Sequence, residues 1–443
     1  MATTLSERQK DELHKSIVDY LNSAGYTETM KQFQAEVPGM ADFQPDPASK
    51  TSGILVKKWT SIIRLQKKIL DLEARLSQAL EETSNMVSIG PSSVTKRTNP
   101  DWLPTAGSKH TLTGHRGMVN AVAFHPLYSV LASASDDFTI KIWDWETGEL
   151  ERTLKAHTKR VTDCQFDSKG KQLVTSSYDL FIKLWNVDNA YHNFATLRGH
   201  DHSVSSARFL PGDTHILSSS RDATVRIWEI STTHCIKVFT PHTKWICRAL
   251  TNTTGRYIVT SSMDHTAKVI DAETGSTRAE FRGHDHVVEI AMFVPPGTVP
   301  AIKELVAQVP GAPVPDADSL SFAYVATGSR DRTVRLWDAT HGQMLWTFVG
   351  HDNWVRDIVF HPAGKHMITA ADDSTYRIWD LKTGRCVRVV EAHERFVSCI
   401  AWGRQTVSAE SSNGNSSEGP APTRLLNVIA TGGSDQTVKI WLP

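Results

Sequence analysis

The chain has 443 residues, 40% of them hydrophobic, and its 48 Lys and Arg side chains balance 48 Asp and Glu side chains. This length exceeds what one hydrophobic core holds, so several domains or a repeat array are expected, and the balanced charge disfavours nucleic-acid binding. The N-terminus lacks a signal-peptide pattern, no stretch reaches the roughly 18 apolar residues of a membrane helix, and five Cys residues without a C-x-x-C pair argue against disulfides and zinc. These features predict a soluble intracellular protein without membrane insertion.

The first predicted element is a helical hairpin over residues 7–39. One helical face of RQKDELHKSIVDYLNSAGY is apolar, Gly25 is a suitable helix stop, and ETMKQFQAE offers a second short helix. The pattern L-x-x-x-I-x-x-Y-L-x-x-x-G-Y-x-x-T-x-x-x-F-x-x-E resembles the LisH motif, a dimerisation element. About 33 residues are too few for a good independent core, so pairing of two copies is physically sensible. The residues expected at this dimer contact are Leu13, Ile17, Tyr20, Leu21 and Phe33.

A coiled coil is predicted next, over residues 54–82, between linkers at 40–53 and 83–108. Ile at position a with Leu at position d in the central heptads favours a parallel two-stranded coil, and Lys68 at g can meet Glu73 at the partner's e position. The alternative is an amphipathic helix packed on the following domain, which the intervening polar linker disfavours. Two dimerising elements in series predict a homodimer. The residues expected at the coiled-coil contact are Leu55, Ile62, Leu65, Ile69, Leu72 and Leu76.

Residues 109–443 contain a sevenfold repeat. A small residue or Pro followed by His recurs at intervals of 42 or 43 residues, with one interval of 67. In each copy a Ser or Thr stands four residues before an Asp, and a Trp follows that Asp by six residues, except in the fourth copy, which has Ile270. Runs such as TVRIW, with β-branched residues at period two, predict strands. Two representative sets are His115, Ser133, Asp137 and Trp143, and His351, Thr369, Asp373 and Trp379.

These copies resemble the WD-repeat family, in which each copy makes a four-stranded blade. The resemblance implies an all-β, seven-bladed WD-repeat propeller. Because the chain ends at about the third strand of the last copy, we expect residues 109–113 to close that blade and remove its free edge. Insertions near 295–320 and 404–423 lie between the first and second strands of their blades, opposite the His-bearing face, and both compositions suit mobile loops.

The His, Ser or Thr, Asp and Trp of each copy allow two interpretations. A catalytic triad needs its nucleophile once, whereas this set occurs seven times. A buried hydrogen-bond relay that ties the strands together is therefore favoured. The pairs His200 with His202 and His284 with His286 could be metal half-sites, but each uses a His of the relay. The sequence thus assigns no catalytic, cofactor-binding or metal-binding residue.

Two positions in each copy define the rim of the His-bearing face. Aromatic and Arg side chains gather there, and these residue types dominate protein-interface hot spots. The alternative is a set of aromatic side chains that pack only against their neighbours. The third residue after the repeat His is Met118, Arg160, Ser203, Trp245, Val287, Trp354 and Phe396. The residue before the turn Asp is Asp136, Tyr178, Arg221, Met263, Arg330, Asp372 and Ser434.

The order of LisH, a short coiled coil (KKWTSIIRLQKKILDLEARL) and seven WD repeats resembles the lissencephaly-type dynein regulators, which include the nudF-type proteins of filamentous fungi. The segment GHDNWVRDIVFHP adds to this resemblance, and the two insertions favour a fungal member. The resemblance implies a non-enzymatic homodimer without a cofactor that binds the cytoplasmic dynein heavy chain and promotes motor activity in nuclear migration and spindle positioning. It also implies a nudE-type coiled-coil partner, indirect association with microtubules, and a location in the cytoplasm and cytoskeleton, at microtubule plus ends and spindle poles.

The resemblance also implies that motor-binding residues fall on the rim, at Arg221, Arg330 and Trp354. Two positions depart from the family pattern, since a basic residue is replaced by Cys247, with Arg248 next to it, and a Lys is replaced by Ser374. The alternatives are a generic WD-repeat scaffold, such as a ubiquitin-ligase receptor or a non-catalytic subunit of a phospholipid acetylhydrolase, and, third, an enzyme. The full set expected on the dynein-binding face is Arg221, Trp245, Arg248, Arg330, Trp354 and Phe396.

Overall fold

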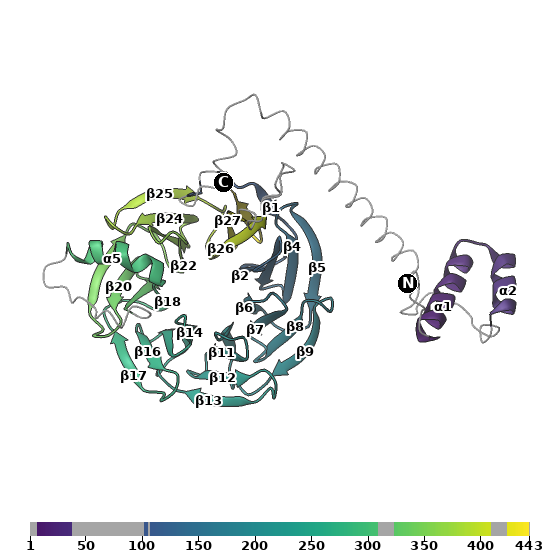
Figure 1. The fold of residues 1–443 in the computed structure, drawn as a ribbon, viewed down its shortest axis with the longest axis horizontal. Helices are drawn as coiled ribbons and strands as arrows, with labels where there is room; N and C mark the ends of the chain where they lie inside the picture. The colour runs from purple at the N-terminus through teal and green to yellow at the C-terminus, as the bar shows by residue number, and fades with distance from the viewer. Residues whose placement is uncertain (1–6, 38–101, 105–106, 309–322, 409–422, 443) are drawn as a thin grey trace, which may run out of the picture. The chain divides into compact units, whose positions relative to one another are not determined.

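The computed structural model describes two separate units, a helical hairpin near the N-terminus and a seven-bladed β-propeller (Figure 1). The propeller confirms the all-β fold class predicted from the repeats. The coiled coil predicted at 54–82 lies outside the described residues, as do the linker 40–53 and most of the linker 83–108. The residues that the structure describes are 7–37, 102–104, 107–308, 323–408 and 423–442.

The hairpin consists of α1 (Glu7–Ser23) and α2 (Thr27–Glu36). Between them Gly25 has a φ of +83°, a left-handed conformation that Gly adopts without a steric penalty. This turn lets the backbone N–H of Tyr26 donate to the carbonyl oxygen of Leu21 at 2.9 Å. None of the described helices is both long and apolar enough to span a membrane.

Each blade of the propeller is a four-stranded antiparallel sheet whose strands run in order from the centre of the ring outward (Figure 1). The first strands are β2 (Val119–Phe124), β6 (Val161–Phe166), β10 (Val204–Phe209), β14 (Ile246–Thr251), β18 (Val288–Phe293), β22 (Val355–Phe360) and β26 (Val397–Ser408). The second strands are β3 (Val130–Ser135), β7 (Gln172–Ser177), β11 (His215–Ser220), β15 (Tyr257–Ser262), β19 (Tyr324–Ser329), β23 (His366–Ala371) and β27 (Thr423–Gly433).

The outer half of each blade is formed by the third and fourth strands. The third strands are β4 (Thr139–Asp144), β8 (Ile182–Asn186), β12 (Val225–Glu229), β16 (Ala267–Asp271), β20 (Thr333–Asp338), β24 (Thr375–Asp380) and β28 (Val438–Trp441). The fourth strands are β5 (Glu149–Lys155), β9 (His192–Leu197), β13 (Cys235–Phe239), β17 (Thr277–Phe281), β21 (Met344–Val349), β25 (Cys386–Glu391) and, in blade 7, β1 (His110–Leu112).

The core of the propeller lies between neighbouring blades. In β3 and β7 every residue after the first is buried, and their sequences VLASAS and QLVTSS are rich in small side chains that let adjacent sheets approach closely. Hydrophobic clusters accordingly combine residues of two consecutive blades, as Ile140 and Ile142 of blade 1 do with Val161 and Leu173 of blade 2. Packing between blades, together with the antiparallel pairing within them, therefore holds the ring.

The ring is closed by a pairing between distant parts of the chain. β1 runs antiparallel to β28, with His110 opposite Ile440 and Leu112 opposite Val438. Leu112 is almost fully buried and shares a hydrophobic cluster with Val438 and Ile440. The outer edge of the third strand in the last blade is thus paired rather than free.

A short segment before β1 also contacts the propeller. The ring of Trp102 lies 6.1 Å from that of Trp402, and the carbonyl oxygen of Trp102 accepts a hydrogen bond from His361 Nε2 at 3.0 Å. Arg388 donates to the carbonyl oxygen of Pro104 at 2.6 Å. These contacts fix the chain to blades 6 and 7 before it enters the closing strand.

The first insertion contains ordered structure that its composition did not predict. The turn η2 (Pro296–Thr298) leads into α5 (Val299–Val306), whose Ile302 and Leu305 are fully buried in a cluster with Tyr324 of blade 5. The prediction of a mobile loop is wrong for this part, because VPAIKELV has its Pro in the first helical turn, where Pro is tolerated, and keeps its apolar residues on one helical face. The rest of that insertion, 309–322, lies outside the described residues.

The second insertion joins two long strands. β26 and β27 extend to Ser408 and back from Thr423, so the ends of the insertion belong to blade 7. Both insertions connect the first and second strands of their blades. Residues 409–422 lie outside the described part of the chain.

Candidate protein-binding face

The repeated His, Ser, Asp and Trp form a hydrogen-bond relay inside blade 1. Ser133 Oγ lies 2.7 Å from His115 Nε2 and accepts a hydrogen bond from Trp143 Nε1, also at 2.7 Å. The other imidazole nitrogen, Nδ1, lies 2.8 Å from Asp137 Oδ2. All four side chains therefore have partners, which buried polar groups require.

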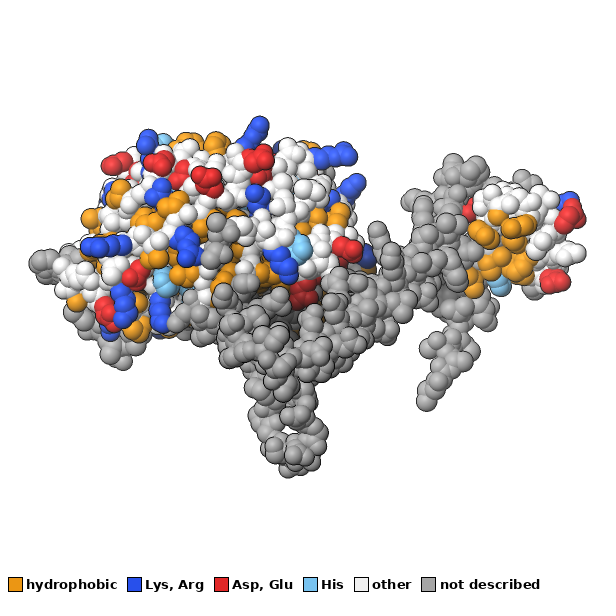
Figure 2. Space-filling view, turned by 90° about the horizontal axis from the view of Figure 1, so that it is seen from above, with side chains coloured by type: hydrophobic (Ala, Val, Ile, Leu, Met, Phe, Trp, Pro, Cys, Tyr) orange, Lys and Arg blue, Asp and Glu red, His pale blue; other side chains and the backbone are white. Residues whose placement is uncertain are grey.

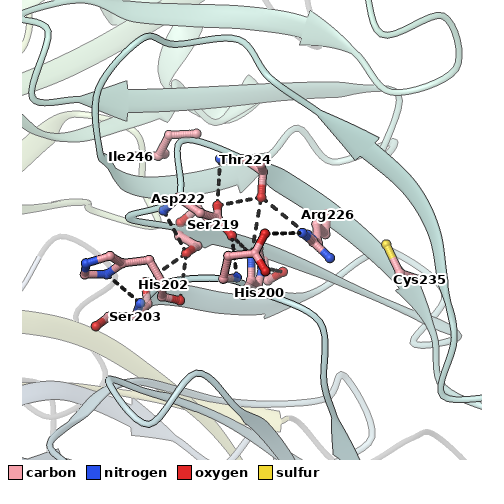
Figure 3. A network of polar contacts seen from close by, with 12 residues as sticks. His200, His202, Ser203, Ser219, Asp222, Thr224, Arg226, Cys235 and Ile246 are labelled. Carbon is pink, nitrogen blue, oxygen red and sulfur yellow. Dashed lines mark hydrogen bonds and ion pairs between the residues drawn. The ribbon is translucent and has the colours of Figure 1, made fainter.

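The same relay occurs in the other blades, except that blade 4 has Ile270 in place of the Trp donor. In blade 6 His351 contacts Thr369 and Asp373 at 2.7 Å each, and Trp379 donates to the Thr369 hydroxyl at 2.9 Å. Figure 3 shows the network of blade 3, where His200 and Asp222 face each other and Thr224 lies beside both. The contacts from His to the hydroxyl and to Asp are present in all seven blades.

The relay Asp also stabilises an unusual turn. In every blade the residue directly after the relay Asp has a left-handed backbone, for example Phe138 with φ +68° and Ser374 with φ +69°. The Asp side chain accepts a hydrogen bond from the backbone N–H two residues after it, as Asp137 does from Thr139 at 2.9 Å. Burial by itself would raise the pKa of Asp137, but hydrogen bonds from His115, Thr139 and the backbone lower it below its ordinary value. The carboxylate is therefore a structural acceptor and not a proton donor.

A backbone hydrogen bond repeated in all seven blades joins the two rim positions. The N–H of Tyr178 donates to the carbonyl oxygen of Arg160 at 3.0 Å, and the N–H of Arg330 donates to that of Val287 at 2.9 Å. The corresponding donors of the other blades are Asp136, Arg221, Met263, Asp372 and Ser434. Because this bond fixes both positions relative to the strands, the rim side chains emerge at equivalent places around the ring.

Several rim side chains surround one central hollow of about 310 Å³. Trp245 is 39% exposed, whereas Arg221 and Arg330 are half-buried. The rim residues that line the hollow are Met118, Arg160, Tyr178, Arg221, Trp245, Met263 and Arg330. Amino acids far apart in the sequence thus share one surface.

Arg side chains stack on aromatic rings between neighbouring blades. The Arg221 guanidinium lies 4.4 Å from the centroid of the Trp245 ring, and that of Arg330 lies 4.3 Å from the centroid of Trp354. Arg356 also lies over Trp354, at 5.0 Å. Such contacts hold the guanidinium planes in fixed orientations while leaving their edges available for hydrogen bonds.

Carboxylates neutralise the part of the face around Trp354. Glu289 forms an ion pair with Arg330 and lies 3.4 Å from Arg356. The N–H of Arg356 Nε is shared between both carboxylate oxygens of Asp372, and Nη2 donates to Oδ2 at 2.7 Å. Burial disfavours the charge of Arg356, but Asp372 and Glu289 outweigh it and raise its pKa. The sequence did not single out Glu289 or Arg356, each of which lies two residues beyond a rim position, inside β18 and β22.

Three other predicted residues have different surroundings. Arg248 Nη1 donates to Asp357 Oδ1 at 2.8 Å inside the ring, so this guanidinium is engaged with a carboxylate. Phe396 is 46% exposed at the equivalent rim position of blade 7 and does not line the hollow. Cys247 does line it, and burial raises the pKa of its thiol far above the ordinary value.

The hairpin residues predicted for dimerisation are partly accessible. Leu13 and Tyr20 are each 39% exposed, and Ile17, Leu21 and Phe33 are half-buried. The Phe33 ring makes an edge contact with His14, with centroids 5.9 Å apart. Figure 2 shows hydrophobic side chains gathered on one face of this unit. These five residues, called the hairpin stripe below, therefore offer apolar surface in addition to the contacts between the two helices.

Potential metal ligands do not cluster in the described residues: no group of three or more His, Cys, Asp or Glu side chains is placed to hold an ion. The His residues of the two predicted half-sites have other partners. His200 and His284 belong to the relays, and the Nδ1 atoms of His202 and His286 accept the next backbone N–H at 2.8 Å.

Comparisons with known proteins give matches along the whole chain. Residues 7–40 match the PAC1 LisH domain, and seven segments between 107 and 441 match the WD domain, G-beta repeat. The chain is 42% identical to nuclear distribution protein PAC1-1 of Uncinocarpus reesii and 43% identical to nuclear distribution protein nudF of Aspergillus niger, covering all of both chains in each case. It is 45% identical to nuclear distribution protein PAC1 of Tuber melanosporum over 99% of this chain and 98% of that protein.

Proposed function

Since the chain belongs to the PAC1/nudF family of nuclear distribution proteins, we propose that it is a non-enzymatic, homodimeric regulator of the cytoplasmic dynein motor. In this proposal one propeller face binds the dynein heavy chain and promotes motor activity, in support of nuclear migration and spindle positioning. The protein acts in the cytoplasm and on the cytoskeleton, at microtubule plus ends and spindle poles, and associates with microtubules indirectly. A nudE-type coiled-coil protein is a second partner.

The observation that carries the proposal is the stacking of Arg on Trp at two places on one face. Arg221 with Trp245 and Arg330 with Trp354 occupy the same two repeat positions in different blades. Trp and Arg are the residue types most enriched in interface hot spots, and fixed side chains lose little entropy on binding. A rigid set of this kind suits recognition of a protein surface.

Dimerisation is proposed through the hairpin together with the coiled coil predicted at 54–82. The exposed stripe that includes Leu13 and Tyr20 is apolar, and a unit of this size gains stability by covering it. Two copies of the propeller in one dimer raise the effective concentration of the second face once the first is bound.

The competing proposal is a generic WD-repeat scaffold that serves another complex. Affinity purification of the full chain from extract of its own cells, followed by mass spectrometry, separates the two. We expect recovery of the dynein heavy chain with the wild type and its loss with the combined Arg221→Ala, Arg330→Ala and Trp354→Ala variant. Absence of the heavy chain from the wild-type sample would favour the scaffold.

A further inference from the structure

On two sides of the binding face the Arg charges are compensated differently. Around Trp354, the guanidinium groups of Arg330 and Arg356 are paired with Glu289 and Asp372. On the other side, in blades 2 and 3, Arg160 and Arg221 have neither an ion pair nor a side-chain hydrogen bond within the described part of the chain.

These two Arg residues are held by one aromatic ring. The guanidinium carbon of Arg160 lies 3.6 Å from the centroid of Tyr178, and that of Arg221 lies 4.4 Å from it. Arg221 also stacks on Trp245 at 4.4 Å, so its plane is held between two rings. Stacking uses the faces of a guanidinium group and leaves its five N–H donors, which lie in the plane, to find acceptors.

The surroundings of these two Arg residues favour an anion from another molecule as their hydrogen-bond acceptor. Arg160 and Arg221 are both half-buried, and unpaired donors at such a position lose part of their hydration. Burial and the neighbouring positive charge of Arg160 lower the pKa of Arg221. An anion placed between the two guanidinium groups relieves this repulsion.

The residues that line the hollow also favour an anion, because their Arg side chains outnumber their acidic ones. Among the described residues that line the hollow, Glu289 is the single acidic one, and Arg330 and Arg356 already engage it. Met118, Met263 and Trp245 line it as well and offer apolar contact beside the charges. The methylene groups of a Glu side chain and the adjoining peptide chain can use such contact, whereas a free inorganic anion cannot.

We propose that Arg160, Tyr178 and Arg221 form a carboxylate-binding site. It binds the carboxylate of an acidic segment of a partner protein that inserts into the central hollow. The inference rests on the proposed function for its partner and deepens it by naming the chemistry of the docking segment. Two guanidinium groups converging on one carboxylate give charge-assisted hydrogen bonds. Arg160 and Tyr178 thereby join the binding face as specificity-determining residues.

A labelled hexaglutamate peptide is a direct probe of the carboxylate-binding site. Its binding to the full-length protein is measured by fluorescence anisotropy at constant ionic strength, with hexaglutamine as the neutral comparison. We expect Arg160→Gln and Arg221→Gln each to weaken hexaglutamate binding about tenfold, the loss typical of one charge-assisted contact. Arg256→Gln is the matched control, because Arg256 stacks on Tyr257 at 5.5 Å in the β14–β15 connection, away from the His-bearing face.

Thermal unfolding of each variant shows whether the fold is retained, and Tyr178→Phe, which keeps the aromatic platform, is expected to bind hexaglutamate like the wild type. Equal binding of hexaglutamine, or unchanged hexaglutamate binding by both Arg variants, would overturn the proposal. Tighter binding of a hexaglutamine peptide carrying one phosphoserine would overturn the choice of carboxylate.

A parallel titration with purified dynein motor domain separates this inference from the proposed function. If hexaglutamate binding depends on Arg160 but the protein does not bind the motor, the result contradicts the proposed function and supports the carboxylate-binding site. If the wild-type protein binds the motor but not hexaglutamate, the result contradicts the carboxylate-binding site and leaves the proposed function standing.

Discussion

The guanidinium carbon of Arg330 lies 4.3 Å from the centroid of the Trp354 ring, although the two residues belong to neighbouring blades. Arg221 and Trp245 repeat this relationship at 4.4 Å. In both pairs the Arg precedes a relay Asp and the Trp follows the next relay His by three residues. The structural repeat therefore builds the same cation–π pair twice on one face.

Trp354 is expected to be the most sensitive single position of the face, because its ring supports both Arg330 and Arg356. Trp354→Ala should weaken binding of the full-length protein to the dynein motor domain about 30-fold, corresponding to about 2 kcal/mol for a hot-spot residue. Surface-immobilised motor domain and soluble protein provide the measurement. Phe194→Ala is the control, since Phe194 is exposed on the outer strand β9. Equal losses for the two variants would contradict a specific role of Trp354.

Trp102 is expected to stabilise the closed propeller. Its ring packs in the cluster that joins blades 6 and 7, so Trp102→Ala should lower the free energy of unfolding by about 2 kcal/mol through lost apolar burial. Urea denaturation of the full-length protein, followed by Trp fluorescence, measures the change. Tyr128→Ala is a suitable comparison because that ring is largely exposed in the β2–β3 connection. An unchanged midpoint for Trp102→Ala would show that the segment before β1 adds nothing to the fold.

The relay carboxylates predict loss of stability in acid. Burial alone would raise the pKa of Asp373, but hydrogen bonds and charge from His351 and Thr375 lower it below the ordinary value of about 3.9. A carboxylate with a lowered folded-state pKa contributes stability above about pH 4, and this contribution is lost as the pH falls toward the folded-state value. The free energy of unfolding should therefore decrease below about pH 4.

Asp373→Asn tests this linkage. At pH 7 the variant should be less stable than the wild type by about 1–3 kcal/mol, because the relay loses a charge-assisted partner. The difference should shrink as the pH is lowered below about 4, because the carboxylate of the unfolded chain becomes protonated there while the folded-state pKa is lower. Urea denaturation at a series of pH values gives both numbers. A difference that stays constant across the series would mean that the ionised carboxylate is not what stabilises the relay.

The hairpin stripe predicts a defined effect on oligomeric state. Leu13→Glu combined with Tyr20→Glu places two charges on the exposed apolar stripe of α1 and should reduce the dimer fraction of the full-length protein. Sedimentation velocity measures this fraction, and the unfolding midpoint of the propeller should not change. Lys31→Ala on α2 is the control, because Lys31 is exposed and pairs only with the exposed Glu28 among the described residues. An unaltered dimer fraction in the double variant would move dimerisation away from this stripe.

Repetition made much of the fold accessible from the sequence. The spacing from Ser133 to Asp137 recurs in all seven copies, and the spacings from His115 to Ser133 and from Asp137 to Trp143 recur in most of them, so the sequence predicts the blade number and the backbone positions of the rim. The side chains at those positions were also identifiable, because the same offsets apply in each copy. Rim residues such as Arg221 and Trp354 could therefore be named before their neighbours were known.

Contacts between blades were not accessible in this way. Arg248 meets Asp357 of blade 6 across the interior of the ring, and no local spacing relates these two residues. The stacking of Arg221 on Tyr178 likewise depends on where neighbouring blades place their side chains. In α5, Pro-rich composition concealed a short helix that only packing against blades 5 and 6 makes stable.

Titration of the purified dynein motor domain with the full-length protein tests the central claim most directly. We predict that the combined variant Arg221→Ala, Arg330→Ala and Trp354→Ala loses motor binding while its unfolding midpoint and dimer fraction match the wild type. The matched variant Arg256→Ala, Tyr128→Ala and Phe194→Ala, which alters exposed side chains away from the rim, should bind normally. Wild-type affinity in the first variant would contradict the assignment of this face.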